Sequence, residues 1–136
     1  MRNMKASTES LHAAKAIQTK ASALGFDWPD ISGVMEKIHE EIAEIQEALN
    51  EEDHEHAKKE LGDLLFAVVN ASRFLDADPV QELAAASERF TQRFDLLQFK
   101  LRAADKGITD CTIDELDLLW ESVKKELVMS RKNGLT

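Results

Sequence analysis

Two pairs of acidic residues have a spacing that suits metal chemistry. Glu41 and Glu44 are three positions apart, and Glu60 and Asp63 repeat the spacing after fifteen intervening residues. Residues three apart lie on the same face of a helix, and two helices packed antiparallel could bring the pairs together. Converging carboxylates repel each other unless a cation neutralises them, and oxygen-only ligands suit Mg²⁺ or Mn²⁺. The spacing therefore predicts a magnesium site, with manganese as the alternative, that could share its cation with substrate phosphates.

The second pair lies inside a strongly apolar segment, KKELGDLLFAVVNASRFL, residues 58–75. Glu60, Asp63 and Asn70 follow one stripe of this segment at helical spacing. An ionised carboxylate that is buried without a partner costs several kcal/mol, so a segment built for burial needs something to neutralise these acids. A metal site meets this need. The structural alternative is a polar core pair that fixes helix register, and for Glu41 and Glu44 alone it is a solvated helix face.

The elements that must position these residues are helices. Periodicity, caps and breakers predict five of them, at about residues 8–24, 30–49, 54–75, 79–104 and 113–127, with 128–136 as a frayed tail. Asp78 followed by Pro79 marks the start of the fourth helix, and TIDE, from Thr112 to Glu115, is a capping box that opens the fifth. We therefore predict an all-α helical bundle that forms a single domain, residues 1–136, with its core at about 8–127.

The third predicted helix is apolar on nearly all sides, which is typical of a helix at the centre of an assembly. The second predicted helix has a narrower inward face, made by Val34, Ile38, Ile42, Ile45 and Leu49. A small bundle surrounds a central helix more easily when a second subunit contributes helices. We therefore expect a homo-oligomer, either a homodimer or a homotetramer.

The composition excludes several classes of protein. The chain has 136 residues and a net charge of −9, which argues against a nucleic-acid partner because phosphate contacts need a basic surface. No apolar run reaches the roughly 20 residues of a membrane helix, and the opening MRNMKASTES lacks the apolar stretch of a signal peptide. The single cysteine, Cys111, fits a reducing compartment. We expect a cytoplasmic protein with neither a nucleic-acid nor a membrane partner.

Five strings occur in the order GFDWPD, EKIHEEIAEIQEAL, KKELGDLLFAVVNASRFL, ERFTQRF and DELDLLWESVKKEL. With them the chain resembles the MazG family of nucleoside triphosphate pyrophosphohydrolases, and in particular a C-terminal MazG domain occurring as a free-standing protein. The resemblance covers about residues 11–127. It implies a helical-bundle dimer, sometimes assembled further. The sequence lacks a second MazG-like half, which puts in doubt any role specific to a two-domain protein.

The resemblance also implies roles for individual residues. The catalytic metal ligands would be Glu41, Glu44, Glu60 and Asp63, with Glu40 as an accessory carboxylate. Substrate contacts would come from the basic residues Lys37, Arg89 and Arg93, from Asn70, and from the aromatic residues Phe26, Trp28 and Trp120. Each contact has a structural alternative: surface ion pairing for the arginines, plain exposure for the lysine, core packing for Trp120, and a hydrophobic clamp at the end of the bundle for Phe26 and Trp28.

The activity that the resemblance implies is magnesium-dependent hydrolysis of nucleoside triphosphates to a monophosphate and pyrophosphate, as part of nucleotide-pool housekeeping. The closest alternatives are a dCTP- or dUTP-specific enzyme and a phosphoribosyl-ATP pyrophosphohydrolase, which share the carboxylate motif. A di-iron bundle is a further enzymatic alternative, because Glu36 and His39 form one E-x-x-H pair. The non-enzymatic alternative is an acidic helical interaction module.

Overall fold

The computed structural model describes residues 4–132, which form helices and loops and contain no strand. The helices are α1 (Met4–Ala23), α2 (Ile31–Asn50), α3 (His54–Phe74), α4 (Pro79–Ala103), the short 3₁₀ helix η1 (Ile108–Asp110) and α5 (Ile113–Lys132). The all-α prediction is confirmed. None of these helices is both long and apolar enough to span a bilayer. The chain divides into two compact units, one ending at Leu83 and the other beginning at Ala84.

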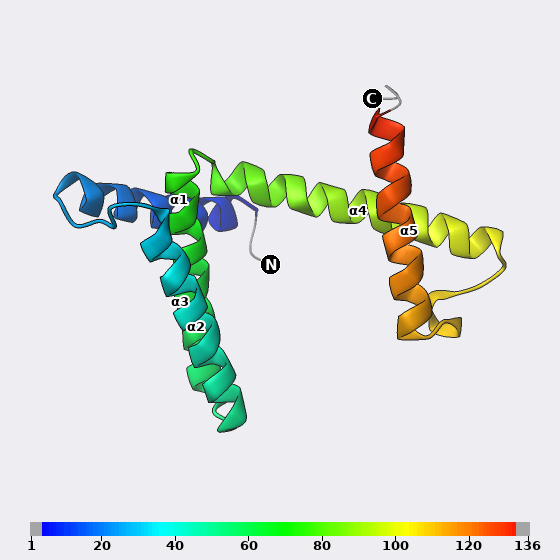
Figure 1. Cartoon of the computed structure of the whole chain (residues 1–136), viewed down its shortest axis with the longest axis horizontal. Helices are drawn as coiled ribbons and strands as arrows, with labels where there is room; N and C mark the ends of the chain where they lie inside the picture. The colour runs from blue at the N-terminus through cyan, green and yellow to red at the C-terminus, as the bar shows by residue number, and fades with distance from the viewer. Residues whose placement is uncertain (1–3, 133–136) are drawn as a thin grey trace. The chain divides into compact units, whose positions relative to one another are not determined.

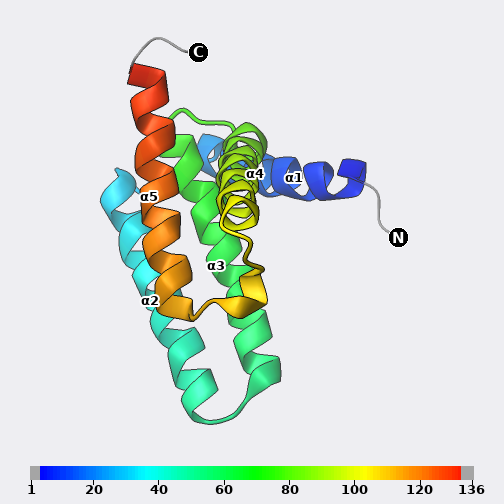
Figure 2. The same cartoon turned by 90° about the vertical axis from the view of Figure 1, so that its right-hand side faces the viewer.

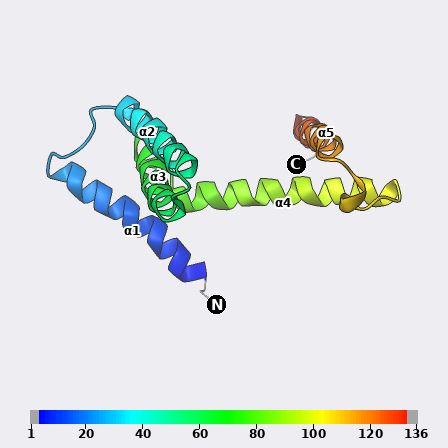
Figure 3. The ribbon, with the colours of Figure 1, turned by 90° about the horizontal axis from the view of Figure 1, so that it is seen from below.

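The first unit is built around the antiparallel pair α2 and α3, which lie side by side and are joined by a short loop (Figures 1 and 2). Both helices have side-chain N-caps: Asp30 accepts a hydrogen bond from the Ser32 amide at 2.8 Å, and Asp53 accepts one from the His56 amide at 3.1 Å. Helix α1 lies against α3 (Figure 3). The antiparallel arrangement that the short connection predicts is therefore present.

The second unit contains most of α4 together with α5, packed on a small apolar core. Leu97, Leu101 and Val123 are buried in it, at 4%, 5% and 0% exposure. The capping box of α5 is confirmed, because the Thr112 hydroxyl accepts from the Glu115 amide and the Glu115 carboxylate accepts from the Thr112 amide, both at 3.1 Å.

Two predicted boundaries were wrong: α1 begins at Met4 and not at about residue 8, and α5 continues past residue 127. Residues 128–132 continue α5 as a helix and are not a frayed tail, while 133–136 lie outside the described residues. Leu127, the last residue of the predicted helix, packs against the core of this unit, whereas Val128 and Met129 beyond it are exposed. The 3₁₀ turn η1 was not predicted, because three residues carry no periodic signal.

The predicted inward faces are only partly buried in the single chain. Val34 is 1% exposed, but Ile42 is 46% exposed and Leu49 51%. Helix α3 also leaves large side chains exposed, namely Leu61, Leu65, Phe66 and Val68. The hydrophobic periodicity of a helix identifies its apolar face, but it does not show which other element covers that face.

Candidate metal and nucleotide site

Three of the predicted ligands meet between α2 and α3. One carboxylate oxygen each from Glu41, Glu60 and Asp63 lies within 4.8 Å of the other two. Glu41 and Glu60 are buried, at 3% and 6% exposure, whereas Asp63 is exposed. The antiparallel packing of α2 and α3 thus brings together residues 22 positions apart along the chain, the difference between 63 and 41.

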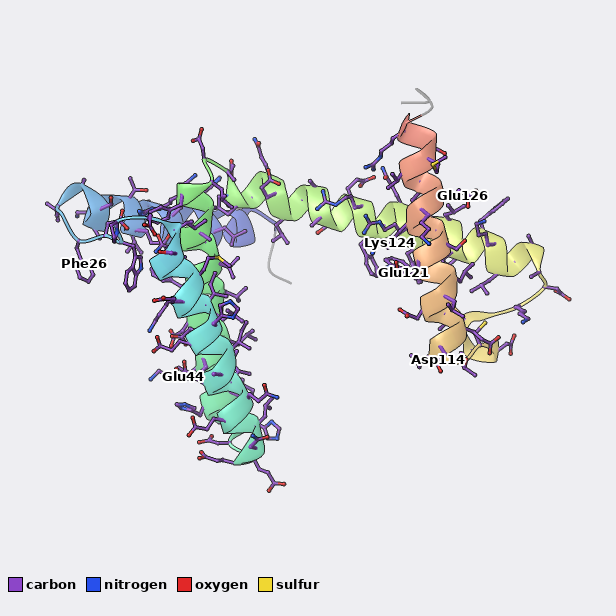
Figure 4. The ribbon with its side chains drawn as sticks, in the orientation of Figure 1. Phe26, Glu44, Asp114, Glu121, Lys124 and Glu126 are labelled. Atoms are coloured by element: carbon purple, nitrogen blue, oxygen red, sulfur yellow. The ribbon has the colours of Figure 1, made fainter. Side chains whose placement is uncertain are left out.

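The remaining predicted acids lie beside this cluster. Glu44, labelled on α2 in Figure 4, is half-buried and hydrogen bonds to the Glu60 carboxyl. It is not part of the set of three. Glu40 is exposed, and its Oε1 lies 3.4 Å from Lys37 Nζ. The predicted set thus divides into a compact trio and two flanking carboxylates.

The proximity of the acids shifts their proton affinities. The hydrogen bond to Glu41, followed by that to Glu44 and by burial, raises the pKa of Glu60 to about 8. The same hydrogen bond from Glu60, helped by the nearby Lys37 ammonium, lowers the pKa of Glu41. Glu60 therefore holds a proton at neutral pH when no cation is present, and a bound cation would take that proton's place.

Basic side chains contact both buried acids. Lys37 Nζ lies 3.2 Å from Glu41 Oε1, so this partly exposed lysine contacts one of the buried acids. His56 Nε2 lies 3.5 Å from Glu60 Oε1. Apart from the hydrogen bonds that the acids share with one another, Glu41 Oε2 and Glu60 Oε2 have no partner among the described residues. Buried acceptors without partners are rare and call for an explanation.

A cation explains these acceptors. The donor set consists only of carboxylate oxygens, which is the set that Mg²⁺ and Mn²⁺ prefer, and two of the oxygens are buried without a partner. The residues present therefore fit the predicted cation. The di-iron alternative finds no support in this cluster, because His39 is exposed and the trio contains no histidine.

A cavity of about 650 Å³ lies next to the trio. Six of the predicted site residues line this one cavity: Glu41, Asp63, Lys37, Phe26, Trp28 and Asn70. The volume falls within the roughly 300–1,000 Å³ of small-molecule sites. The two predicted aromatic contacts differ in exposure, since Trp28 is 45% exposed and Phe26, labelled in Figure 4 on the α1–α2 loop, is 85% exposed.

The loop that carries these aromatics is tied to α3 by an ion pair. Arg73 Nη2 lies 2.6 Å from Asp27 Oδ2, and Arg73 Nη1 also reaches the carboxylate, at 3.4 Å. The hydrogen bond from the Ser22 hydroxyl, followed by those from the Trp28 amide and Arg73, lowers the pKa of Asp27. Sequence reasoning missed this pair, and the acidic residue in GFDWPD was its only signal.

Trp28 is positioned by a close approach to α2. A Cβ added at Gly33 would lie 2.7 Å from Trp28 Cδ2, which is shorter than a van der Waals contact between two carbon atoms. Only glycine leaves room for the indole to lie on the first turns of α2. Gly62, in contrast, has open space around its Cα.

The remaining predicted contacts lie in the second unit. Arg89 is exposed and Arg93 half-buried, both on α4. Trp120 is half-buried in the apolar core, with its ring centroid 5.2 Å from that of Phe90. The packing alternative for Trp120 is thus observed within this unit. The substrate roles of these three residues stay predictions.

Besides the Arg73–Asp27 pair, the sequence analysis also missed Gln18 on α1. It is 6% exposed and lines the cavity, and its Nε2 donates a hydrogen bond to the Phe66 carbonyl at 2.8 Å. Its sequence signal is a polar side chain between the stripe residues Ala14, Ile17 and Ala21. The role of α1 as a wall of the cavity was not predicted.

Comparison with known proteins yields one family and a small group of relatives. Residues 30–95 match the MazG nucleotide pyrophosphohydrolase domain, a span that contains all four predicted metal ligands. The chain is 41% identical over 115 residues to the nucleoside triphosphate pyrophosphohydrolase/pyrophosphatase MazG of Thermotoga maritima, covering 85% of this chain and 44% of that protein. It is 32% identical over 122 residues to the nucleoside triphosphate pyrophosphohydrolase of Escherichia coli K12, covering 88% of this chain and 46% of the relative.

The chain therefore spans about half the length of these relatives. Residues 30–95, which match the family domain, include the acidic trio, Lys37 and more than half of the residues that line the cavity. From the family match and the identities over most of its length, the chain belongs to the MazG family.

Proposed function

We propose that the protein hydrolyses nucleoside triphosphates to the monophosphate and pyrophosphate, with Mg²⁺ as its cation. The observation that carries the proposal is the meeting of three carboxylates with a cavity large enough for a nucleotide. The names of the relatives, both nucleoside triphosphate pyrophosphohydrolases, support the same reaction.

The carboxylates of Glu41, Glu60 and Asp63 would hold the cation, with Glu44 and Glu40 beside them. When bound, the cation supplies Lewis-acid polarisation of the phosphates and lowers the pKa of a water molecule. An acidic protein can bind a polyphosphate in this way, because the cation separates the two sets of negative charge. The acidic interaction module gives no reason for two carboxyl groups to be buried against each other, as those of Glu41 and Glu60 are.

The side chains around the cation would divide the remaining work. Lys37 lies 3.2 Å from Glu41 and lines the cavity, where its ammonium could bind a phosphate oxygen. Trp28, with Phe26 nearer the solvent, offers a flat surface for the nucleobase, and the apolar wall restricts water around it. Arg89 and Arg93 would bind the leaving pyrophosphate, and Trp120 would contact the nucleotide.

We also propose that the chain functions as a homo-oligomer in the cytoplasm. Four large apolar side chains of α3 are exposed in the single chain, at 44–57%: Leu61, Leu65, Phe66 and Val68. Exposed apolar surface of this extent on a central helix favours association with a second copy. The unpaired Cys111 fits a reducing compartment.

The test of the activity is pyrophosphate release from a panel of canonical and modified ribo- and deoxyribonucleoside triphosphates, with Mg²⁺ and with a chelator. We expect Mg²⁺-dependent formation of the monophosphate. A narrow response to dCTP, dUTP or phosphoribosyl-ATP alone would favour the specific alternatives. Absence of turnover across the panel would contradict the proposal and favour the interaction module.

A further inference from the structure

The buried acceptors without a partner are concentrated around one cavity. The structure has four such side-chain atoms among its described residues: Gln18 Oε1, Glu41 Oε2, Glu60 Oε2 and Asn70 Oδ1. A cation explains the two carboxylate oxygens. The two amide oxygens belong to residues that line the 650 Å³ cavity, and a cation site of carboxylates does not account for them.

Gln18 has a fixed orientation. Its Nε2 donates to the Phe66 carbonyl at 2.8 Å, and because a carbonyl oxygen can only accept, the amide nitrogen must face α3. The oxygen Oε1 is then left as the free acceptor of the side chain. With 6% exposure, Gln18 cannot satisfy this oxygen by turning into bulk water without breaking the bond to α3.

The position of Gln18 along α3 places it next to the acids. Its anchor, Phe66, is three residues after Asp63, and Asn70 is four residues after Phe66, so the two amides follow the acid at successive turns of one helix. An occupant whose phosphates lie at the acids would therefore extend its nucleoside toward Gln18 and Asn70. The surrounding wall is apolar and includes Ile17 and Trp28.

We propose that Gln18 determines substrate specificity by accepting a hydrogen bond from a donor group of the nucleoside, with Asn70 as a second acceptor. The donor is an exocyclic amino group of the base or a hydroxyl of the sugar. Gln18 lies on α1, outside the residues 30–95 that match the family domain. The proposal rests on the proposed nucleotide hydrolysis.

The physical basis is the cost of an unsatisfied acceptor. A substrate that offers N–H or O–H to Gln18 Oε1 satisfies it, while an analogue that offers a carbonyl or a C–H leaves a buried acceptor unpaired. The expected discrimination is about tenfold, the size of one hydrogen bond between neutral groups. Selectivity of this kind changes the ratio of kcat/KM between paired substrates.

The experiment compares paired nucleotides in the full chain and in Gln18→Leu, which removes the acceptor at similar size. The pair dATP and 2′-deoxynebularine triphosphate, which carries hydrogen in place of the amino group, isolates the base amino group, and the series CTP, dCTP and ddCTP isolates the sugar hydroxyls. Calorimetric Kd values for the corresponding monophosphates in chelator give a readout independent of turnover. Gln46→Leu on α2, an exposed glutamine, is the matched control.

We expect one of these ratios to favour the donor-bearing substrate about tenfold in the wild type and to fall to near unity in Gln18→Leu, with Gln46→Leu unchanged. Gln18→Met, which is unbranched like glutamine, serves the same purpose if the leucine variant does not fold. Equal loss for all nucleotides, or ratios near unity in the wild type, would overturn the proposal and leave Gln18 as a tie between α1 and α3. Absence of binding and turnover for every nucleotide would overturn the proposed function together with it.

Discussion

The two units of the chain differ in the polar side chains that they bury. Around α2 and α3, carboxylates are buried and large apolar side chains are exposed: Glu41 is 3% exposed and Leu65 57%. In the unit of α4 and α5, Leu97, Leu101 and Val123 form the buried core, no charged side chain among the described residues is buried, and ion pairs such as Lys100–Glu126, at 2.7 Å, lie partly exposed outside the core. Burial of charge costs free energy, so buried carboxylates are expected where a bound ligand offsets that cost.

The difference separates a unit organised around a site from one organised around packing. Substitutions at the acids should change function more than stability, and substitutions in the apolar core should do the reverse.

The largest effect is expected from Asp63→Asn. Removing one of the three converging carboxylates should lower kcat by about 10²–10³-fold or more, because the cation and the phosphate charge lose a fixed partner. Pyrophosphate release at saturating Mg²⁺ measures it, with Asp117→Asn, an exposed acid of α5, as the control. Full turnover in Asp63→Asn would remove the functional half of the comparison.

Leu101→Ala tests the expectation that the unit of α4 and α5 is organised around packing. Leu101 is 5% exposed, and its truncation leaves a cavity that should lower the free energy of unfolding by about 3 kcal/mol. Leu118→Ala, at a residue 73% exposed, should change it by less than about 0.5 kcal/mol. Urea denaturation gives both values. Equal effects of the two substitutions would show that the α4–α5 core is not packed as described.

Gly33→Ala tests how the aromatic loop is held. The added Cβ would clash with the Trp28 ring, so either the indole moves or the domain loses about 1–2 kcal/mol of stability. We expect KM to rise with little change in kcat, because Trp28 lines the cavity and does not touch the acids. The matched change Gly62→Ala, on an open face of α3, should be neutral or slightly stabilising. A Gly33→Ala protein with unchanged KM and stability would argue against this contact.

The smallest effect concerns pH in the absence of a cation. Since the folded-state pKa of Glu60 is raised from 4.5 to about 8, the folded chain retains a proton that the unfolded chain has released, and stability falls as pH rises between these values. The pKa of Glu41 is lowered, so its protonation changes the stability only at pH values below 4.5 and does not affect this range. In chelator, the Tm of the wild type should therefore drop relative to that of Glu60→Gln from pH 5.5 to 8.5.

Parallel shifts of the two melting curves would contradict the coupling between these acids. Glu82→Gln, an exposed acid in the first turn of α4, is the control for a loss of charge without a buried partner. Added Mg²⁺ should raise the Tm of the wild type at pH 8.5 and leave that of Glu60→Gln nearly unchanged.

Local signals predicted the helices and their caps well. Asp78, Thr112 and Glu115 are N-terminal signals that act within one turn, and in the structure the side chains of all three accept hydrogen bonds from backbone amides. The acidic trio was also predictable, because two i, i+3 pairs and one short connection leave few other ways for the helices to meet.

Contacts between distant segments were not predictable. The Gln18–Phe66 bond spans 48 positions and the Arg73–Asp27 pair spans 46, and neither has a local pattern. The exposure of Ile42 and Leu49 was missed for a related reason, since a periodic stripe shows which face is apolar without showing whether the same chain covers it.

The central claim is that the buried carboxylates between α2 and α3 hold a divalent cation, and titration with Mn²⁺ followed by electron paramagnetic resonance tests it most directly. The wild type should bind Mn²⁺, more tightly when a nonhydrolysable nucleoside triphosphate is present, and the double variant Glu41→Gln/Asp63→Asn should lose this binding while remaining folded. Equal Mn²⁺ binding by the wild type and the double variant, or none by the wild type even with nucleotide, would contradict the claim.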